Sequence, residues 1–128
     1  MARSAAYARI RRDVLAITAA VPTGRLVTHA AIGAHLDVVP RHVAYILSML
    51  TAEEKDSLPW HPVVGADGAV RAPRPGATSQ ASLLLADGIS LGPDGRVADL
   101  ALRIADVATL PHGVPKQTRP AARATRRR

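Results

Sequence analysis

The chain has 128 residues, which suits one domain with a single modest core, and its 48% hydrophobic content without Phe makes that core aliphatic. It contains no Cys, which excludes a disulfide framework, a thiolate metal site and a cysteine nucleophile. Its net charge of +7 indicates an anionic partner. No apolar run approaches the ~20 residues that span a bilayer, so we expect a cytoplasmic protein with no membrane partner, nucleoid-associated if bacterial.

Three helices are predicted in the first half of the chain. Apolar residues recur at helical spacing over residues 4–20, and Thr28 can cap a second helix over 29–36. Pro40 suits the first turn of a third helix, over 40–51, because an N–H needs no helical partner there. Two helices joined by a short turn are typical of a helix-turn-helix unit, although many helical domains share this pattern.

The second half of the chain alternates between loops, turns and short elements. Pro, Gly and Asp-Gly pairs mark its breaks, and a Leu-rich run indicates a helix. In chain order we expect a polar, acidic loop over 51–57, a small hairpin or wing over 63–70, an irregular loop over 71–76, a helix over 77–86, a hairpin over 89–99 and a partly helical stretch over 100–110.

Pro, Gly and Arg dominate the chain after residue 110, and we expect this part to be disordered. Residues 115–128 hold six of the seventeen Lys and Arg side chains and none of the ten acidic ones, which leaves eleven basic and ten acidic before them. The predicted organisation is thus a nearly neutral folded domain, 1–110, and a basic tail, 111–128. The tail is either a solubilising end or a non-specific DNA-binding arm.

Five short motifs along the chain occur in an order known from one family. They are Gly24-Arg25-Leu26-Val27-Thr28-His29, Arg41-His42-Val43-Ala44, Pro59-Trp60-His61, Val63-Val64 with Asp67-Gly68, and Leu84-Leu85-Ala86-Asp87-Gly88. Over residues 7–101 the chain resembles the C-terminal domain of the O6-alkylguanine-DNA alkyltransferases. Trp60 stands where that family keeps its reactive Cys, which is the mark of the non-catalytic alkyltransferase-like proteins. The resemblance implies an α/β, mostly α, fold: a winged helix-turn-helix-like domain.

The resemblance also implies how the chain binds duplex DNA. In the family the second helix of the helix-turn-helix enters the minor groove, and an Arg, here Arg41, replaces the flipped nucleotide in the base stack. Small residues let this helix approach the groove, and side chains at the start of the preceding helix contact a phosphate. The implied DNA-binding residues are Arg41, Thr28, His29, His42, Ala44 and Tyr45. Without the resemblance, Arg41 and His29 would be interpreted as solvated residues at helix starts.

A lesion pocket is implied around the Trp60 motif. Its residues would be Trp60, His61, Pro59, Val63, Asp87, Arg71 and Arg74. Trp60 would pack against a flipped, alkylated purine, and Arg71 or Arg74 would stack on the altered base through a cation–π contact. The alternative for Trp60 is the centre of the core. Pro62 replaces the Arg that the family keeps after its His, a departure that affects lesion choice more than DNA binding.

We therefore expect a monomer, not an enzyme, that binds duplex DNA through the minor groove, flips O6-alkylguanine into a pocket at Trp60 and leaves the alkyl group in place. It would use no cofactor or metal and would flag the lesion for nucleotide excision repair proteins. The alternative is a DNA-binding regulator or architectural protein without lesion selectivity. An enzyme of another class would have only His61 and Asp87 for acid–base chemistry, and we expect these two to shape the pocket by hydrogen bonding.

Overall fold

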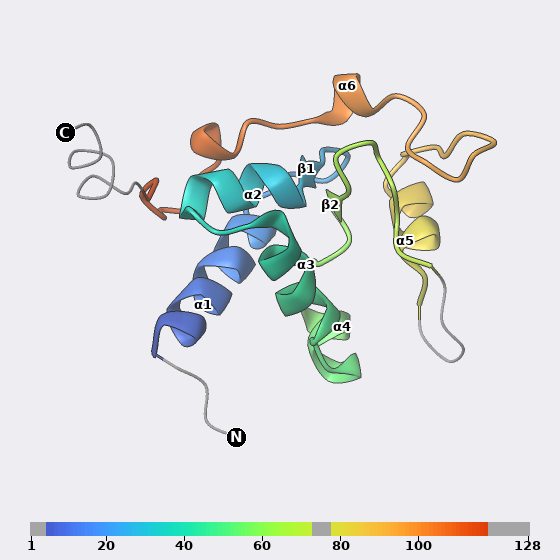
Figure 1. The fold of residues 1–128 in the computed structure, drawn as a ribbon. Coiled ribbons are helices and arrows are strands. Elements are labelled where there is room, and N and C mark those ends of the chain that lie inside the picture. The colour runs from blue at the N-terminus through green and yellow to red at the C-terminus, as the bar shows by residue number, and fades with distance from the viewer. Residues whose placement is uncertain (1–4, 73–77, 118–128) are drawn as a thin grey trace.

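The computed structural model describes residues 5–72 and 78–117, and the fold is mostly helical with a small parallel sheet (Figure 1). The elements are α1 (Ala5–Ala19), β1 (Val27–Thr28), α2 (His29–Leu36), α3 (Pro40–Ser48), α4 (Ala52–Ser57), β2 (Val63–Val64), α5 (Gln80–Ala86), α6 (Leu100–Arg103) and the 3-10 helix η1 (Val107–Thr109). The predicted fold class is confirmed. Among these described helices none has the length and apolar character needed to cross a membrane.

The helix-turn-helix unit is formed by α2 and α3, as the sequence predicts. The Thr28 hydroxyl accepts a hydrogen bond from the Ala31 N–H at 3.0 Å and caps α2. The chain then turns sharply through Asp37, whose φ is 60°. Gly33 permits this turn, because a Cβ there would lie 2.5 Å from the Val38 carbonyl oxygen. The third helix starts at Pro40 and is shorter than predicted, ending at Ser48.

The core has two parts, both mainly aliphatic, as the composition requires. The larger part joins α1, α2, α3 and β2 around Trp60, the one large aromatic side chain buried in the described chain. Its fully buried members include Val14, Ile17, Ile32 and Val43. The smaller part packs Leu84 of α5 against residues that include Leu26, Val64, Ile89 and Val97. The two strands run between these parts and connect them.

The expected hairpin over 63–70 is wrong in its pairing. Val63–Val64 forms β2, which pairs in parallel with β1, with Val27 opposite Val63 and Thr28 opposite Val64. The Asp-Gly turn itself is present, closed by a hydrogen bond from the Gly65 N–H to the Ala69 carbonyl at 2.9 Å. Ala69 then pairs with Arg96, which belongs to the hairpin over 89–99, instead of with β2. Parallel pairing places the start of α2 beside the Trp60 segment.

Residues 51–57, expected as a loop, form α4. The Thr51 hydroxyl accepts from the Glu54 N–H at 3.1 Å, and the Glu54 carboxylate accepts from the Thr51 N–H at 2.9 Å. This reciprocal capping box starts a helix that buries no residue, so apolar periodicity could not predict it. The helix expected over 77–86 starts at Gln80, with Ser79 as its cap. The hairpin over 89–99 is present, with Leu91 opposite Val97.

The disorder expected from Pro111 onward is wrong for residues 111–117. This segment crosses the end of α2, where His35 Nε2 lies 2.7 Å from the Val114 carbonyl oxygen and the Gln117 N–H donates to the His35 carbonyl at 2.7 Å. His112 packs edge-on against His35, with 5.0 Å between ring centroids. These contacts supply partners for backbone groups that composition alone predicts to be solvated. The remaining part of the predicted tail, 118–128, lies outside the described residues.

Candidate DNA-binding face and base-sized pocket

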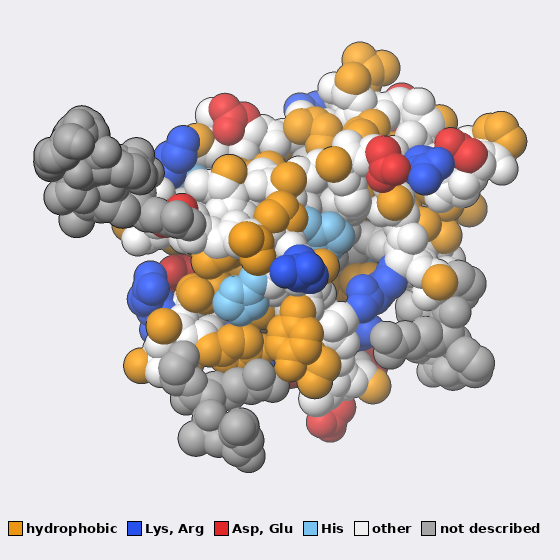
Figure 2. All heavy atoms as spheres, viewed as in Figure 1, with side chains coloured by type: hydrophobic (Ala, Val, Ile, Leu, Met, Phe, Trp, Pro, Cys, Tyr) orange, Lys and Arg blue, Asp and Glu red, His pale blue; other side chains and the backbone are white. Residues whose placement is uncertain are grey.

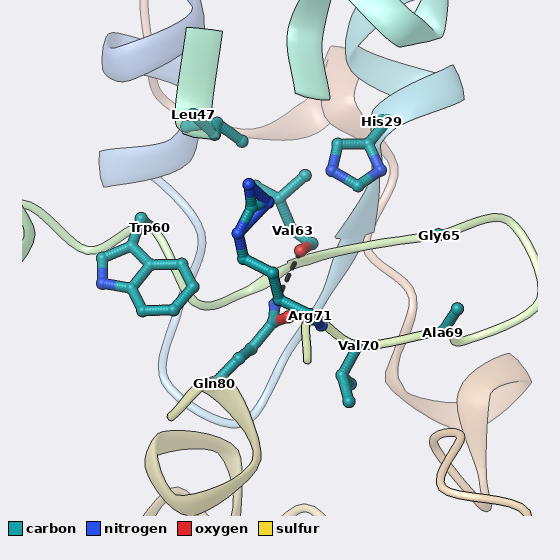
Figure 3. A pocket seen from close by; sticks show the side chains of 9 residues that line it. All are labelled: His29, Leu47, Trp60, Val63, Gly65, Ala69, Val70, Arg71 and Gln80. Carbon is teal, nitrogen blue, oxygen red and sulfur yellow. Dashed lines mark hydrogen bonds between the residues drawn. The ribbon is translucent and has the colours of Figure 1, made fainter. Parts of the chain in front are cut away.

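A cavity of about 200 Å³ opens between the start of α2, the end of α3, β2 and the start of α5 (Figure 3). Its lining residues are His29, Leu47, Trp60, Val63, Gly65, Ala69, Val70, Arg71 and Gln80. An enclosed apolar cavity of roughly 150 Å³ is large enough to bind benzene. A cavity of this size that is open on one side can therefore hold a flat nucleic-acid base with one edge exposed to solvent.

Trp60 forms one wall of the cavity and also belongs to the core. Its side chain is only 6% exposed and packs in the larger core cluster. The Lys55 ammonium lies 5.1 Å from the ring centroid, a cation–π distance. Trp60 is thus a core residue that also lines this cavity, and its contact with a lesion stays a prediction.

Arg71 and His29 give the cavity its polar character. Figure 3 shows the Arg71 side chain rising between Trp60 and His29, with its guanidinium end toward Leu47. Burial, together with the positive charge of Arg71, lowers the pKa of His29 below its ordinary value of 6.5. The imidazole is therefore neutral at pH 7 and can donate from one nitrogen while it accepts at the other. His29, expected beside a DNA phosphate, lies in the cavity wall.

Gln80 is the polar side chain in the cavity lining that the sequence did not predict. Its side chain is 4% exposed, and its amide group bonds the backbone at three places. Oε1 accepts from the Arg71 N–H at 2.7 Å, and Nε2 donates to the carbonyls of His61 and Val63, each at 2.8 Å. A polar residue directly after the Ser79 cap is a common feature of helix starts, so the sequence held no signal for this arrangement.

The exposed side of α3 is large, apolar and basic. Arg41 is exposed, and the side chains of Val39, Tyr45 and Met49 are 56%, 42% and 53% exposed. His42 lies nearer to α1, where its ring stacks on Tyr7 with 5.9 Å between centroids. Figure 2 shows Lys, Arg and His side chains in the middle of this face, with the Asp and Glu side chains toward its margins. The face is electrostatically suited to a polyanion.

The sequence model of the DNA-binding domain of 6-O-methylguanine DNA methyltransferase matches residues 9–89, more than half of the chain. The chain belongs to this family. No curated protein sequence matches it significantly.

Solved structures of alkyltransferase-like proteins share the fold. S. pombe Atl1 in complex with damaged DNA containing O6-carboxymethylguanine has a TM-score of 0.65 at 19% identity, covering 81% of this chain and 98% of that one. S. pombe ATL in complex with DNA has a TM-score of 0.58 at 20% identity, covering 82% and 98%. The predicted resemblance to alkyltransferase-like proteins is therefore confirmed.

The family's predicted pocket residues divide into three groups in this chain. Trp60, Val63 and Arg71 line the cavity, whereas Pro59, His61 and Asp87 lie outside its lining. Arg74 falls outside the described residues. The second group still has a structural role, since His61 Nε2 lies 2.8 Å from Asp87 Oδ2 and joins the Trp60 segment to the end of α5. Whether any of these residues contacts a lesion stays a prediction.

The remaining predicted DNA-binding residues lie on or beside α3. Arg41 and Tyr45 are exposed one turn apart, and Ala44 is half-buried between them. The Thr28 oxygen accepts the capping bond of α2, which leaves its O–H available as a donor. Within the described ranges, no three His, Asp or Glu side chains gather where they could hold a metal ion.

Proposed function

We propose that this family member binds duplex DNA in the minor groove with α3 and holds a rotated O6-alkylguanine in the cavity beside Trp60. The observation that carries the proposal is the base-sized cavity of about 200 Å³, walled by an indole and a guanidinium, at the edge of a DNA-binding fold. An indole packs against a purine, and an Arg adds a cation–π contact on the ring. The complex of S. pombe Atl1 with DNA containing O6-carboxymethylguanine supports this assignment.

Arg41 would fill the place in the base stack that the guanine leaves. It is exposed at the start of α3, and its guanidinium can bond the orphaned base while it stacks on the neighbouring pair. Tyr45 and Met49 continue the same exposed side. Large apolar side chains of this kind suit insertion into the minor groove better than reading of base edges in the major groove.

The proposed reaction outcome is binding without dealkylation. At the position of the family's reactive Cys, Trp60 offers no nucleophilic atom, and the chain contains no Cys elsewhere. His61 and Asp87 then hold the Trp60 segment in place and activate nothing. A stable protein–lesion complex of this kind would flag the site for nucleotide excision repair proteins.

Binding to two matched duplexes tests the proposal. We expect tighter binding to a duplex with one O6-methylguanine than to the same duplex with guanine. The lesion should be recovered intact after prolonged incubation, as measured by mass spectrometry of the DNA. Equal affinity for the two duplexes would instead indicate a DNA-binding regulator or architectural protein, and loss of the methyl group would indicate an enzyme.

A further inference from the structure

Gln80 is a buried polar side chain whose hydrogen-bonding groups all have partners across the pocket. Its Oε1 accepts one bond from the Arg71 N–H, and its Nε2 donates two bonds, to the carbonyls of His61 and Val63. The chemistry of these partners fixes the orientation of the amide, because an N–H can face only Oε1 and a carbonyl can face only Nε2. No other proteinogenic side chain of this length offers one acceptor and two donors in this geometry.

The three bonds join the opposite walls of the cavity. His61 and Val63 belong to the segment that carries Trp60, whereas Arg71 lies on the return from the turn at residues 65–69. The segments that lead to Trp60 and Arg71 are therefore held at a fixed separation by one side chain. Asp87, at the other end of α5, bonds His61 at 2.8 Å and keeps the helix itself in place against this segment.

The bond to Gln80 holds the backbone of Arg71. Its backbone N–H is the group bonded to Gln80, and its guanidinium lies four bonds of flexible side chain away, between Trp60 and His29 (Figure 3). A side chain with this many rotamers reaches one place reliably only if its backbone is held. Binding groups work only when they are held within about half an ångström of the required position, so the spacing between Trp60 and Arg71 must be fixed.

We propose that Gln80 is a positioning residue that sets the spacing between Trp60 and Arg71, and with it the preference of the pocket for an alkylated base. This inference rests on the proposed function. Gln80 need not touch the DNA, because it acts through the Arg71 backbone. Its loss should lower the affinity for lesion-bearing duplex and leave the affinity for unmodified duplex unchanged, since Arg41, at the start of α3, takes part in none of these bonds.

A purely structural role for Gln80 predicts a different result, and Ser79 provides the matched control. Ser79 is the neighbouring residue, and its hydroxyl accepts from the Ser82 N–H at 3.1 Å to cap α5. Ser79→Ala weakens the same helix without touching the three bonds of Gln80. If only the stability of α5 mattered, Ser79→Ala and Gln80→Leu would change lesion preference alike.

The experiment measures the ratio of affinities for O6-methylguanine and guanine duplexes in the full chain. We expect Gln80→Leu to lower this ratio on the order of tenfold and Ser79→Ala to leave it unchanged. The double variant Arg71→Ala with Gln80→Leu should have the same ratio as Arg71→Ala alone. An unchanged ratio in Gln80→Leu, an equal loss in Ser79→Ala, or additive losses in the double variant would each overturn the proposal.

A second measurement separates failure of this inference from failure of the proposed function. In DNA-free protein, amide hydrogen exchange at Arg71 should be slow in the wild type and in Ser79→Ala, and at least tenfold faster in Gln80→Leu and Gln80→Met, whose side chains lack the acceptor oxygen. A wild type that ignores the lesion would refute the proposed function, whatever Gln80 does. Slow Arg71 exchange in both Gln80 variants would refute the positioning role, whatever the DNA preference.

Discussion

Trp60→Ala tests the double role of Trp60 in the core and in the cavity wall. Replacement of a buried Trp by Ala usually costs about 3–5 kcal/mol. The ring is 6% exposed and packs in the larger core cluster, but it also borders a cavity of about 200 Å³ that is open to solvent. The deletion therefore widens an existing opening instead of creating a closed void, and we expect a loss of about 3 kcal/mol in the free energy of unfolding.

Urea unfolding followed by circular dichroism measures this loss, because the variant lacks the sole Trp as a fluorescent probe. A domain of this size has a stability on the order of 5–15 kcal/mol, so the variant should still fold at low temperature. A cost under about 1 kcal/mol would show that the indole is not packed as described. The matched variant Trp60→Leu keeps apolar volume, and it should lose lesion affinity about tenfold through the missing stacking surface. If Trp60→Leu bound the lesion as well as the wild type, the wall would not act by stacking.

Three further predictions concern charge. Arg41→Ala should weaken binding to lesion-bearing duplex by about 1–3 kcal/mol, because no side chain then takes the place of the flipped nucleotide in the base stack. Titration of both proteins with both duplexes checks this, and equal affinity of variant and wild type for the lesion-bearing duplex would remove Arg41 from the mechanism. Deletion of residues 118–128, which removes five Arg, should weaken binding to every duplex alike and flatten the salt dependence, whereas a loss confined to lesion-bearing DNA would contradict a non-specific arm. The pKa of His29 is lower in the folded protein than in the unfolded chain, so the unfolded chain is protonated at His29 first as the pH falls. The stability that neutral His29 contributes is therefore present above its unfolded pKa of about 6.5 and is lost as the pH falls through the folded value. His29→Gln should thus reduce the fall in unfolding free energy below about pH 6.5, measured by urea titration at several pH values, and an unchanged pH dependence would place His29 in solvent.

The local signals in the sequence predicted the helices of the helix-turn-helix unit. The Thr28 cap, the Pro40 start and the apolar spacing between them act within a few residues, so they could be recognised without the fold. The same approach missed α4, which buries nothing and whose first turn is closed by the Thr51–Glu54 capping box. That box is itself a sequence signature, so this element could have been found.

Long-range pairings could not be predicted from the sequence. The parallel contact of Val27 with Val63 joins segments thirty-six positions apart, and a short apolar run gives no indication of its partner strand. The same holds for the three bonds of Gln80 and for the contact of residues 111–117 with His35. Each of these depends on backbone groups, which every residue carries, and therefore leaves no characteristic side-chain pattern.

The position of His61 and Asp87 bears on the proposed function, in which a methyltransferase fold binds without reacting. Their hydrogen bond of 2.8 Å lies outside the cavity lining, where it ties the Trp60 segment to the end of α5, while Gln80 ties the same segment to the start of that helix. Groups that would serve proton transfer beside a thiol thus remain useful as structural links once a Trp occupies the reactive position. These bonds hold the segment that follows Trp60 at both ends of α5, and a rigid aromatic wall loses little entropy when a base packs against it. In the proposed function, loss of the nucleophile and retention of its former partners are therefore compatible, because binding would depend on the same fixed geometry that catalysis would have required.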